Sequence, residues 1–222
     1  MSFLEKIFVA LISILALLPA LTVHEWAHGF AAYKLGDRTA KLDGRLSLNP
    51  LDHLEPIGSL MLLVFGFGWA KPVPVMTRNF KKPKRDFAIT SLAGPLSNFI
   101  LAFVSAFLVV LFWYLGAYKS ITLEAIALIF EYSAIYNIGL GLFNLIPIPP
   151  LDGSNVLMCI LPNRLAAKYS QIRYYTRYII IGLILLSYLP GINVFAPLNF
   201  LRTEMFTAFT SFADMILSPI FG

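Results

Sequence analysis

The sequence predicts an all-α polytopic membrane protein, a bundle of about four to six transmembrane or re-entrant helices with a small β element near residues 71–80. The composition is the first reason: 58% of the 222 residues are hydrophobic and 13% are charged, whereas about a quarter of a soluble domain is charged. The second reason is that the apolar residues form long uncharged runs, and about 20 such residues carry a helix across the hydrocarbon core. The runs cover residues 7–23, 87–118, 132–151 and 178–201.

The first helix is expected over residues 4–34. Its uncharged run is short, but the helical pattern continues through His24 to Tyr33. A secretory signal peptide is the alternative interpretation of this run. The presence of both Glu5 and Lys6 before it, and the continuation of the pattern beyond any cleavage site, argue against a signal peptide.

Two less regular segments follow. Residues 34–49 are polar, and residues 57–70 are apolar but, at 14 residues, too short for an easy span. A re-entrant or interfacial segment suits that length. Residues 71–80 alternate proline with valine at their start, which predicts an extended edge strand.

The second half of the chain predicts further helices. Long helices are expected over residues 87–118 and 122–145, the second ending before prolines through which a helix cannot continue. A short helix should begin near Gly153, and another span should cover residues 177–189. From Arg202 the apolar residues are interrupted by polar ones, which predicts a tail helix that lies on or partly in the membrane.

The net charge of +5 first suggests nucleic acid as a partner, but the placement of the charges argues against it. Basic residues gather in two loops, 78–85 and 164–177, whereas the turns at 119–124 and 202–204 are nearly neutral. Loops rich in Lys and Arg usually stay on the cytoplasmic side. The sequence shows no internal repeat or linker, so residues 1–222 are expected to form one integral-membrane domain, and the single Cys159 excludes an internal disulfide.

Residues 24–28 form an HExxH motif, His-Glu-Trp-Ala-His. Residues four apart share one helix face, so the imidazoles of His24 and His28 can bind the same ion. Glu25 then reaches the metal-bound water, whose pKa zinc lowers toward neutrality, and takes its proton. The alternative is a pair of satisfied structural histidines, but ionisable side chains in an apolar helix are costly unless they serve a function. The motif therefore predicts one catalytic Zn²⁺ per chain.

A catalytic zinc needs a third protein ligand and an open position. The chain has one further histidine, His53, and one cysteine, so a carboxylate is the better candidate. Asp152 follows a broken helix, an irregular backbone that is tolerated at membrane depth inside protein or beside a water cavity. From the residues alone, Asp152 suits a zinc ligand and an N-cap equally well. The expected topology places His28 and Asp152 at similar depth, nearer the cytoplasmic face.

Taken together, the motifs resemble the site-2 protease family of intramembrane zinc metalloproteases, in a minimal form without PDZ or CBS domains. The resemblance covers most of the chain. It rests on HEWAH at 24–28, SLNP at 47–50, LDH at 51–53, PVPV at 72–75, SLAGPLSN at 91–98, FNLIP at 143–147 and LDG at 151–153. It implies that His24, His28 and Asp152 bind zinc and that Glu25 is the catalytic base.

The resemblance also implies roles for other positions. Asn144 corresponds to the family's asparagine near the metal, a candidate donor to substrate or oxyanion; a buried amide that satisfies broken backbone is the equal alternative. Gly94 and Asn98 either approach the site or form a packing motif, which we favour for Gly94. The segment 71–80 resembles a membrane-adjacent β element that presents an edge to extended substrate, with a structural hairpin as the alternative. Glu55 stands where the family often has aspartate, so no role is assigned to it.

The expected function is hydrolysis of peptide bonds within or near transmembrane segments of membrane proteins, in the prokaryotic plasma membrane. Its partners are therefore a transmembrane substrate and the lipid bilayer, without nucleic acid; the substrate's identity and the oligomeric state stay open. An inactive membrane scaffold is one alternative, against which the complete set of ligands and base argues. A metal-ion transporter is another, but it should show paired broken helices in two related halves, and the sequence contains one such break.

Overall fold

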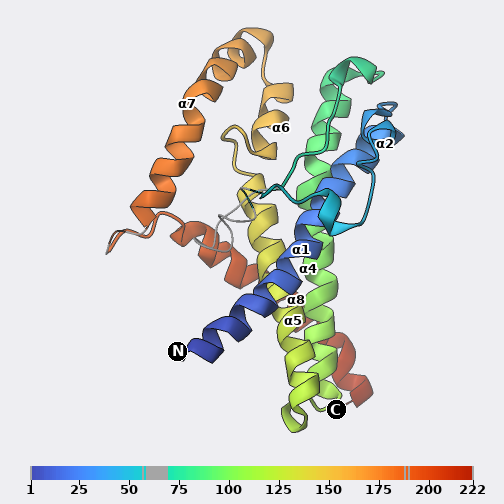
Figure 1. Ribbon diagram of the computed structural model, residues 1–222, viewed down its shortest axis with the longest axis vertical. Coiled ribbons are helices and arrows are strands. Elements are labelled where there is room, and N and C mark those ends of the chain that lie inside the picture. Colours follow the sequence, from blue (N-terminus) through green and yellow to red (C-terminus); the bar gives the residue numbers. More distant parts are fainter. Residues whose placement is uncertain (1, 57, 59–69, 188, 190, 222) are drawn as a thin grey trace. The chain divides into compact units, whose positions relative to one another are not determined.

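The computed structural model of the chain describes residues 2–56, 58, 70–187, 189 and 191–221 (Figure 1). The chain divides into two compact units, which are described separately. The first comprises residues 1–20, 98–142 and 195–222, and the second comprises residues 21–97 and 143–194. Most of the expected re-entrant segment, 57–70, lies outside the described residues.

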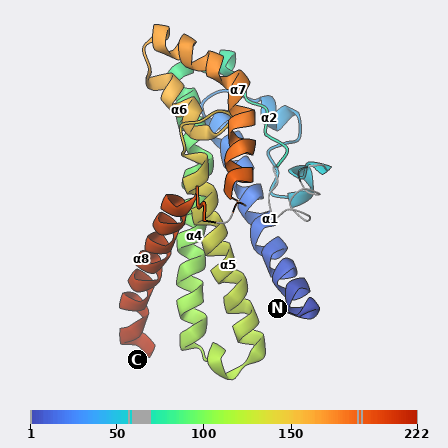
Figure 2. The same cartoon turned by 90° about the vertical axis from the view of Figure 1, so that its left-hand side faces the viewer.

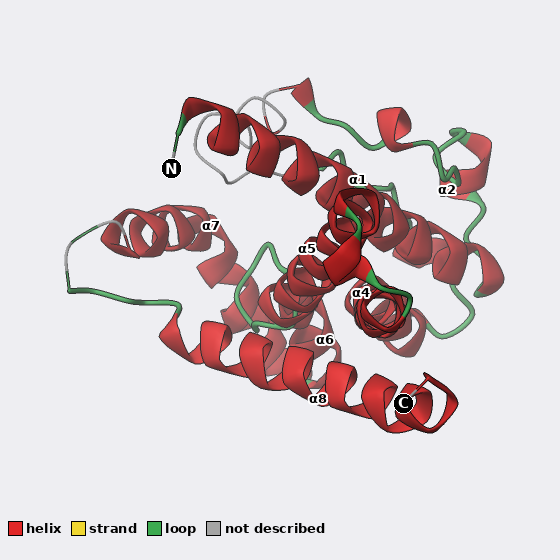
Figure 3. Ribbon diagram, turned by 90° about the horizontal axis from the view of Figure 1, so that it is seen from below, coloured by secondary structure: helices red, strands yellow, loops and turns green. Residues whose placement is uncertain are grey.

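The described residues form helices joined by loops, without a β-strand (Figure 3). The α-helices are α1 (Phe3–Lys34), α2 (Thr39–Leu42), α4 (Pro83–Tyr114), α5 (Ile121–Asn144), α6 (Asp152–Ile160), α7 (Asn163–Ser187) and α8 (Ala196–Phe221). Short 3-10 helices are η1 (Pro50–Asp52), η2 (Thr77–Asn79) and η3 (Ala117–Lys119). An isolated antiparallel bridge joins Leu54 and Ala70. The all-α prediction is confirmed.

Within the described part of the chain, three helices are long and apolar enough to cross a membrane. They are Ile7–Lys34, Pro83–Tyr114 and Ile121–Asn144, with mean hydropathies of 2.4, 2.3 and 1.5. The expected span at 177–189 is instead the C-terminal part of α7, which begins at Asn163. The basic residues expected in a loop at 164–177 lie within α7 instead, so that loop prediction is wrong and α7 as a whole is less apolar than the other three helices.

In the first unit, α4 and α5 run side by side and are joined through η3 (Figure 2). A chain of buried polar groups links the helices. Asn98 donates to the carbonyl of Ala20 at 3.1 Å and to Oδ1 of Asn137 at 2.7 Å, and Asn137 donates to the carbonyl of Ser133 at 2.8 Å. Both asparagines are fully buried. Hydrogen bonds of this kind hold helices together in lipid, where apolar side chains gain little from contacting one another.

The expected tail helix is α8, which packs on α4 in the same unit. The Phe103 ring lies 5.4 Å from the ring of Phe209, and the hydroxyl of Tyr114 donates to Asp214 at 2.8 Å. The acidic side chain in this apolar helix therefore has a partner within the protein.

The second unit contains the C-terminal part of α1 and the segment that was expected to be a strand. Residues 71–80 form no strand in the described structure; they lead into η2, so the predicted β element is not confirmed. Two prolines, Pro72 and Pro74, lack the N–H that a ladder needs. The N–H of Val73 donates to the Glu25 carboxylate and that of Met76 to the Asp37 carboxylate. Side chains thus take the donors that a neighbouring strand would use.

Candidate metal centre

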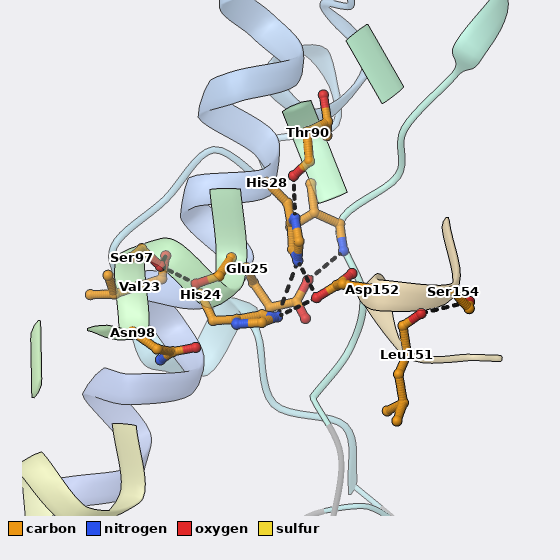
Figure 4. Close-up of polar contacts among 12 residues, drawn as sticks. Val23, His24, Glu25, His28, Thr90, Ser97, Asn98, Leu151, Asp152 and Ser154 are labelled. Atoms are coloured by element: carbon orange, nitrogen blue, oxygen red, sulfur yellow. Dashed lines mark hydrogen bonds and ion pairs between the residues drawn. The ribbon is translucent and has the colours of Figure 1, made fainter. Parts of the chain in front are cut away.

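His24, His28 and Asp152 point toward one another in the second unit (Figure 4). The Nε2 atoms of His24 and His28 lie 3.1 Å apart. Each of them lies 3.2 Å from Oδ2 of Asp152. The three ligand atoms therefore form a nearly equilateral triangle, although Asp152 lies 124 residues after His28 in the sequence.

The donor set and its dimensions fit zinc. A tetrahedral Zn²⁺ with bonds of about 2.0 Å separates its ligand atoms by about 3.3 Å, close to the edges of this triangle. Two imidazoles and one carboxylate are a catalytic rather than a structural set, because they leave a fourth position open. His24, His28 and Asp152 can therefore hold one Zn²⁺ without rearrangement of the chain.

Helix α4 fixes the orientation of the His28 ring through its nitrogen Nδ1, the one that faces away from Asp152. Its Nδ1 lies 2.7 Å from the backbone carbonyl of Thr90. Because a carbonyl only accepts, Nδ1 must carry the proton, which leaves the Nε2 lone pair of the neutral ring for a metal. Because the acceptor is a backbone carbonyl, which every residue has, the sequence could not predict this contact from the identity of residue 90.

Gly94 on α4 makes the close approach of the two histidines possible. A Cβ built at Gly94 would lie 2.6 Å from Cε1 of His28 and 2.7 Å from Cε1 of His24, distances that Cβ atoms do not adopt. The favoured interpretation of Gly94 as a helix-packing residue is therefore wrong, and the alternative holds: Gly94 approaches the site and contacts the candidate ligands themselves.

Asp152 is the first residue of α6, and the N-cap position belongs to Leu151, which makes no side-chain cap. The carboxylate of Asp152 instead faces the two histidines, and its side chain is 16% exposed. The geometry therefore favours the ligand interpretation over the cap.

The segment that carries Asp152 is tightly packed. A Cβ at Gly153 would meet the Leu145 carbonyl group and lie 2.8 Å from the carbonyl oxygen of Ile146. The Tyr169 hydroxyl of α7 donates to the carbonyl of Pro147 at 2.7 Å. These contacts hold the proline-rich turn between α5 and α6, which fixes where α6 begins.

Glu25 faces the same cavity, which has a volume of about 350 Å³. Its Oε2 accepts a hydrogen bond of 2.9 Å from the N–H of Val73. Asn144 also lines the cavity, as do Val73 and Val75. The structure thus brings all five predicted site residues to one cavity: His24, Glu25, His28, Asn144 and Asp152.

Other acidic and imidazole groups lie elsewhere. His53 is buried, and its Nε2 lies 2.8 Å from the carbonyl of Ser47. Glu55 accepts from the N–H of Gly58. Neither residue is part of the cavity lining. Sequence reasoning did not single out Asp37, a fully buried carboxylate that binds the segment beside Glu25; an acidic residue in a polar stretch carries no local sign of such burial.

Comparison with known proteins agrees with this geometry. The model of the family described as Peptidase family M50 matches residues 114–189. "Putative zinc metalloprotease YwhC" of Bacillus subtilis is 45% identical over 166 residues, which is 73% of this chain and 74% of that protein. "Putative zinc metalloprotease MJ0611" of Methanocaldococcus jannaschii is 32% identical over 156 residues, 68% of this chain and 72% of that protein.

A third relative is longer than this chain. "Putative zinc metalloprotease Rip2" of Mycolicibacterium smegmatis is 30% identical over 159 residues, 69% of this chain and 59% of that protein. No solved structure shows a significant match. The described residues include three helices able to cross a membrane, and a relative is 45% identical over most of both chains; the protein is therefore an integral membrane protein that belongs to peptidase family M50, the metalloprotease family of the site-2 proteases.

Proposed function

We propose that this protein is an intramembrane zinc endopeptidase that hydrolyses peptide bonds within or near transmembrane segments of other membrane proteins. One observation carries the proposal: two imidazole nitrogens and one carboxylate oxygen converge within 3.2 Å of one another, beside Glu25, in a cavity of about 350 Å³. We place the activity in a prokaryotic plasma membrane, with residues 1–222 as one catalytic domain and the site nearer the cytoplasmic face.

His24, His28 and Asp152 are the proposed ligands of one zinc ion per chain. When bound there, Zn²⁺ supplies a Lewis acid for the scissile carbonyl and lowers the pKa of water toward neutrality. Glu25 is the proposed general base: its carboxylate takes the proton of the attacking water and delivers it to the leaving nitrogen. The hydrogen bond from the Val73 N–H supports this role, because it fixes the orientation of the Glu25 carboxylate.

Asn144 is proposed to act on the substrate rather than on the metal. Its side chain lines the cavity together with the proposed ligands. An amide donor in that position suits the carbonyl oxygen on which negative charge develops during attack. This assignment rests on placement in the cavity, so it calls for a kinetic test of its own.

The substrate must reach the cavity with its backbone extended. In a transmembrane helix every carbonyl is already hydrogen-bonded, and leaving such groups unsatisfied in lipid costs several kcal/mol each. The segment with Val73 and Val75 lines the cavity, and we propose that the unwound substrate lies against it. Substrates with Gly or Pro near the scissile bond should be cut faster, because these residues weaken a helix by about 1 and 3 kcal/mol.

The function can be tested in cells by comparing membrane proteomes of a strain with the wild-type protein and a strain with Glu25→Gln. We expect single-span proteins or their fragments to accumulate uncut in the variant strain. Equal fragment patterns in the two strains would contradict the protease assignment. Metal uptake by liposomes that contain the wild-type protein would instead favour a transporter.

A further inference from the structure

The segment of residues 71–79, here called the strap, forms one wall of the cavity. It begins where the N–H of Lys71 donates to the His53 carbonyl at 2.8 Å, and it ends with η2. Because Pro72 and Pro74 have no N–H, Val73 provides the one backbone donor of that tripeptide, and this donor binds Oε2 of Glu25 at 2.9 Å. The contact therefore depends on the position of the strap along its own axis.

Asp37 anchors the C-terminal side of the strap. Its side chain is fully buried. Oδ2 accepts from the N–H of Met76 at 2.6 Å, and Oδ1 accepts from the side chain of Asn79 at 2.8 Å. The remaining donors to Oδ1 are the N–H and hydroxyl of Thr39. The Asp37 carboxylate, which lies just after α1, thus holds the strap at Met76, three residues beyond Val73.

Arg45 anchors the N-terminal side. Its side chain is buried, and Nη2 donates to the carbonyl of Lys71 at 2.7 Å and to that of Pro72 at 3.5 Å. Nη1 donates to the carbonyl of Asp52. The planar guanidinium can hold two chain segments at once, which a lysine ammonium does less well. The strap is therefore held by a buried charged side chain on each side of Val73.

We propose that Asp37 and Arg45 are positioning residues for catalysis: they fix the register of the strap, and the strap in turn delivers the Val73 amide to Glu25. Neither residue lines the cavity, so each acts through the strap and not on the substrate. Placing a charge in the protein interior costs free energy unless it is well paired. Strap atoms provide two of the four donors to Asp37 and two of the three carbonyls that accept from Arg45. The inference rests on the proposed function of Glu25 as the base.

The test uses the full-length protein in liposomes with a transmembrane peptide substrate. The variants are Asp37→Ala and Arg45→Ala, with Asp37→Asn and Arg45→Lys as conservative versions and the exposed Asp43→Ala as the matched control. Three quantities are measured: zinc per chain, kcat and KM, and the rate of tryptic cleavage after Arg78, which is exposed within the strap.

We expect both alanine variants to keep zinc, to lose roughly ten- to hundredfold in kcat, and to be cut faster after Arg78. Asp37→Asn keeps one carbonyl acceptor and Arg45→Lys keeps one cation, so both should be intermediate, and Asp43→Ala should match the wild type. Because both anchors hold the same strap, the double alanine variant should lose less than the product of the single losses.

Wild-type kcat in an alanine variant whose strap is cut faster would overturn the inference, because the strap's position would then not matter. Unchanged cleavage after Arg78 would also overturn it, since the residues would not be anchors. Loss of zinc in the conservative variants as well would contradict the inference, because Asp37 and Arg45 would then support the metal centre as a whole and not Glu25. A wild-type protein that holds zinc but cuts no peptide would refute the proposed function, while the rate of cleavage after Arg78 would still test the anchoring.

Discussion

Gly94 of α4 and His28 of α1 approach so closely that no side-chain carbon fits between them. A Cβ at Gly94 would lie 2.6 Å from Cε1 of His28. The candidate metal centre therefore requires glycine at position 94, because any side chain there would occupy the space of the two imidazoles.

Gly94→Ala should disturb both imidazoles and lower the zinc content and the activity together. Gly182→Ala in α7 is the matched control, because a Cβ there meets no atom within 4 Å. Elemental analysis and peptide cleavage on purified protein measure the two effects. Full zinc occupancy with wild-type cleavage in Gly94→Ala would mean that α4 lies farther from α1 than described.

Removal of a proposed ligand should remove the metal. His28→Ala and Asp152→Ala each leave two protein ligands, so we expect most of the zinc to be lost after dialysis against a weak chelator. His53→Ala should retain zinc in the folded fraction, because His53 lies outside the cavity lining. Full zinc in both ligand variants would contradict the assignment.

The HExxH part of this site could be predicted from the sequence, because residues four apart share a helix face whatever the rest of the fold does. Asp152 could not be assigned with the same force. Local sequence is equally compatible with a helix cap at that position, and the choice depends on a contact with residues more than 120 positions away. The structure shows that contact and places Leu151 at the cap.

The element predictions differ from the structure where tertiary contacts take over. Alternating proline and valine predicted a strand at 71–80, but the donors of Val73 and Met76 are bound by side chains from other parts of the chain. The span predicted at 177–189 was placed by hydropathy alone, and the helix in fact begins at Asn163. Helix propensity continues through the polar half of α7, so hydropathy located the apolar part but not the boundary.

Asp37 predicts a dependence of stability on acid pH. Burial raises the pKa of Asp37, but the donors from Thr39, Asn79 and Met76 outweigh it and lower the pKa below its ordinary 3.8. The folded state therefore binds the proton less well than the unfolded state. The resulting stabilisation is complete above the ordinary pKa and is lost as the pH falls through the lower folded-state pKa.

The measurement is thermal unfolding in detergent from neutral pH down to about pH 3 for the wild type and Asp37→Asn. The variant should be less stable at neutral pH, and the difference between the two proteins should shrink as the pH falls. A difference that stays constant over this range would show that the carboxylate's charge does not contribute.

The buried pair of Asn98 and Asn137 predicts coupled effects on stability. Asn137→Ala removes the acceptor of a 2.7 Å hydrogen bond, and should lower the free energy of unfolding by about 0.5–2 kcal/mol, the range that interhelical hydrogen bonds contribute in membranes. The double variant with Asn98→Ala should lose less than the sum of the two single losses. Denaturation titrations in mixed micelles provide these values, and strict additivity would argue against the pair.

The central claim is that Glu25 acts as the general base beside a zinc held by His24, His28 and Asp152. The most direct test is hydrolysis of a defined transmembrane peptide by purified wild-type protein and by Glu25→Gln, with zinc measured in the same samples. The account predicts one zinc per chain in both proteins and cleavage in the wild type alone, because the substitution removes the proton acceptor and leaves the ligands in place. Cleavage by Glu25→Gln at a rate comparable to the wild type would contradict it.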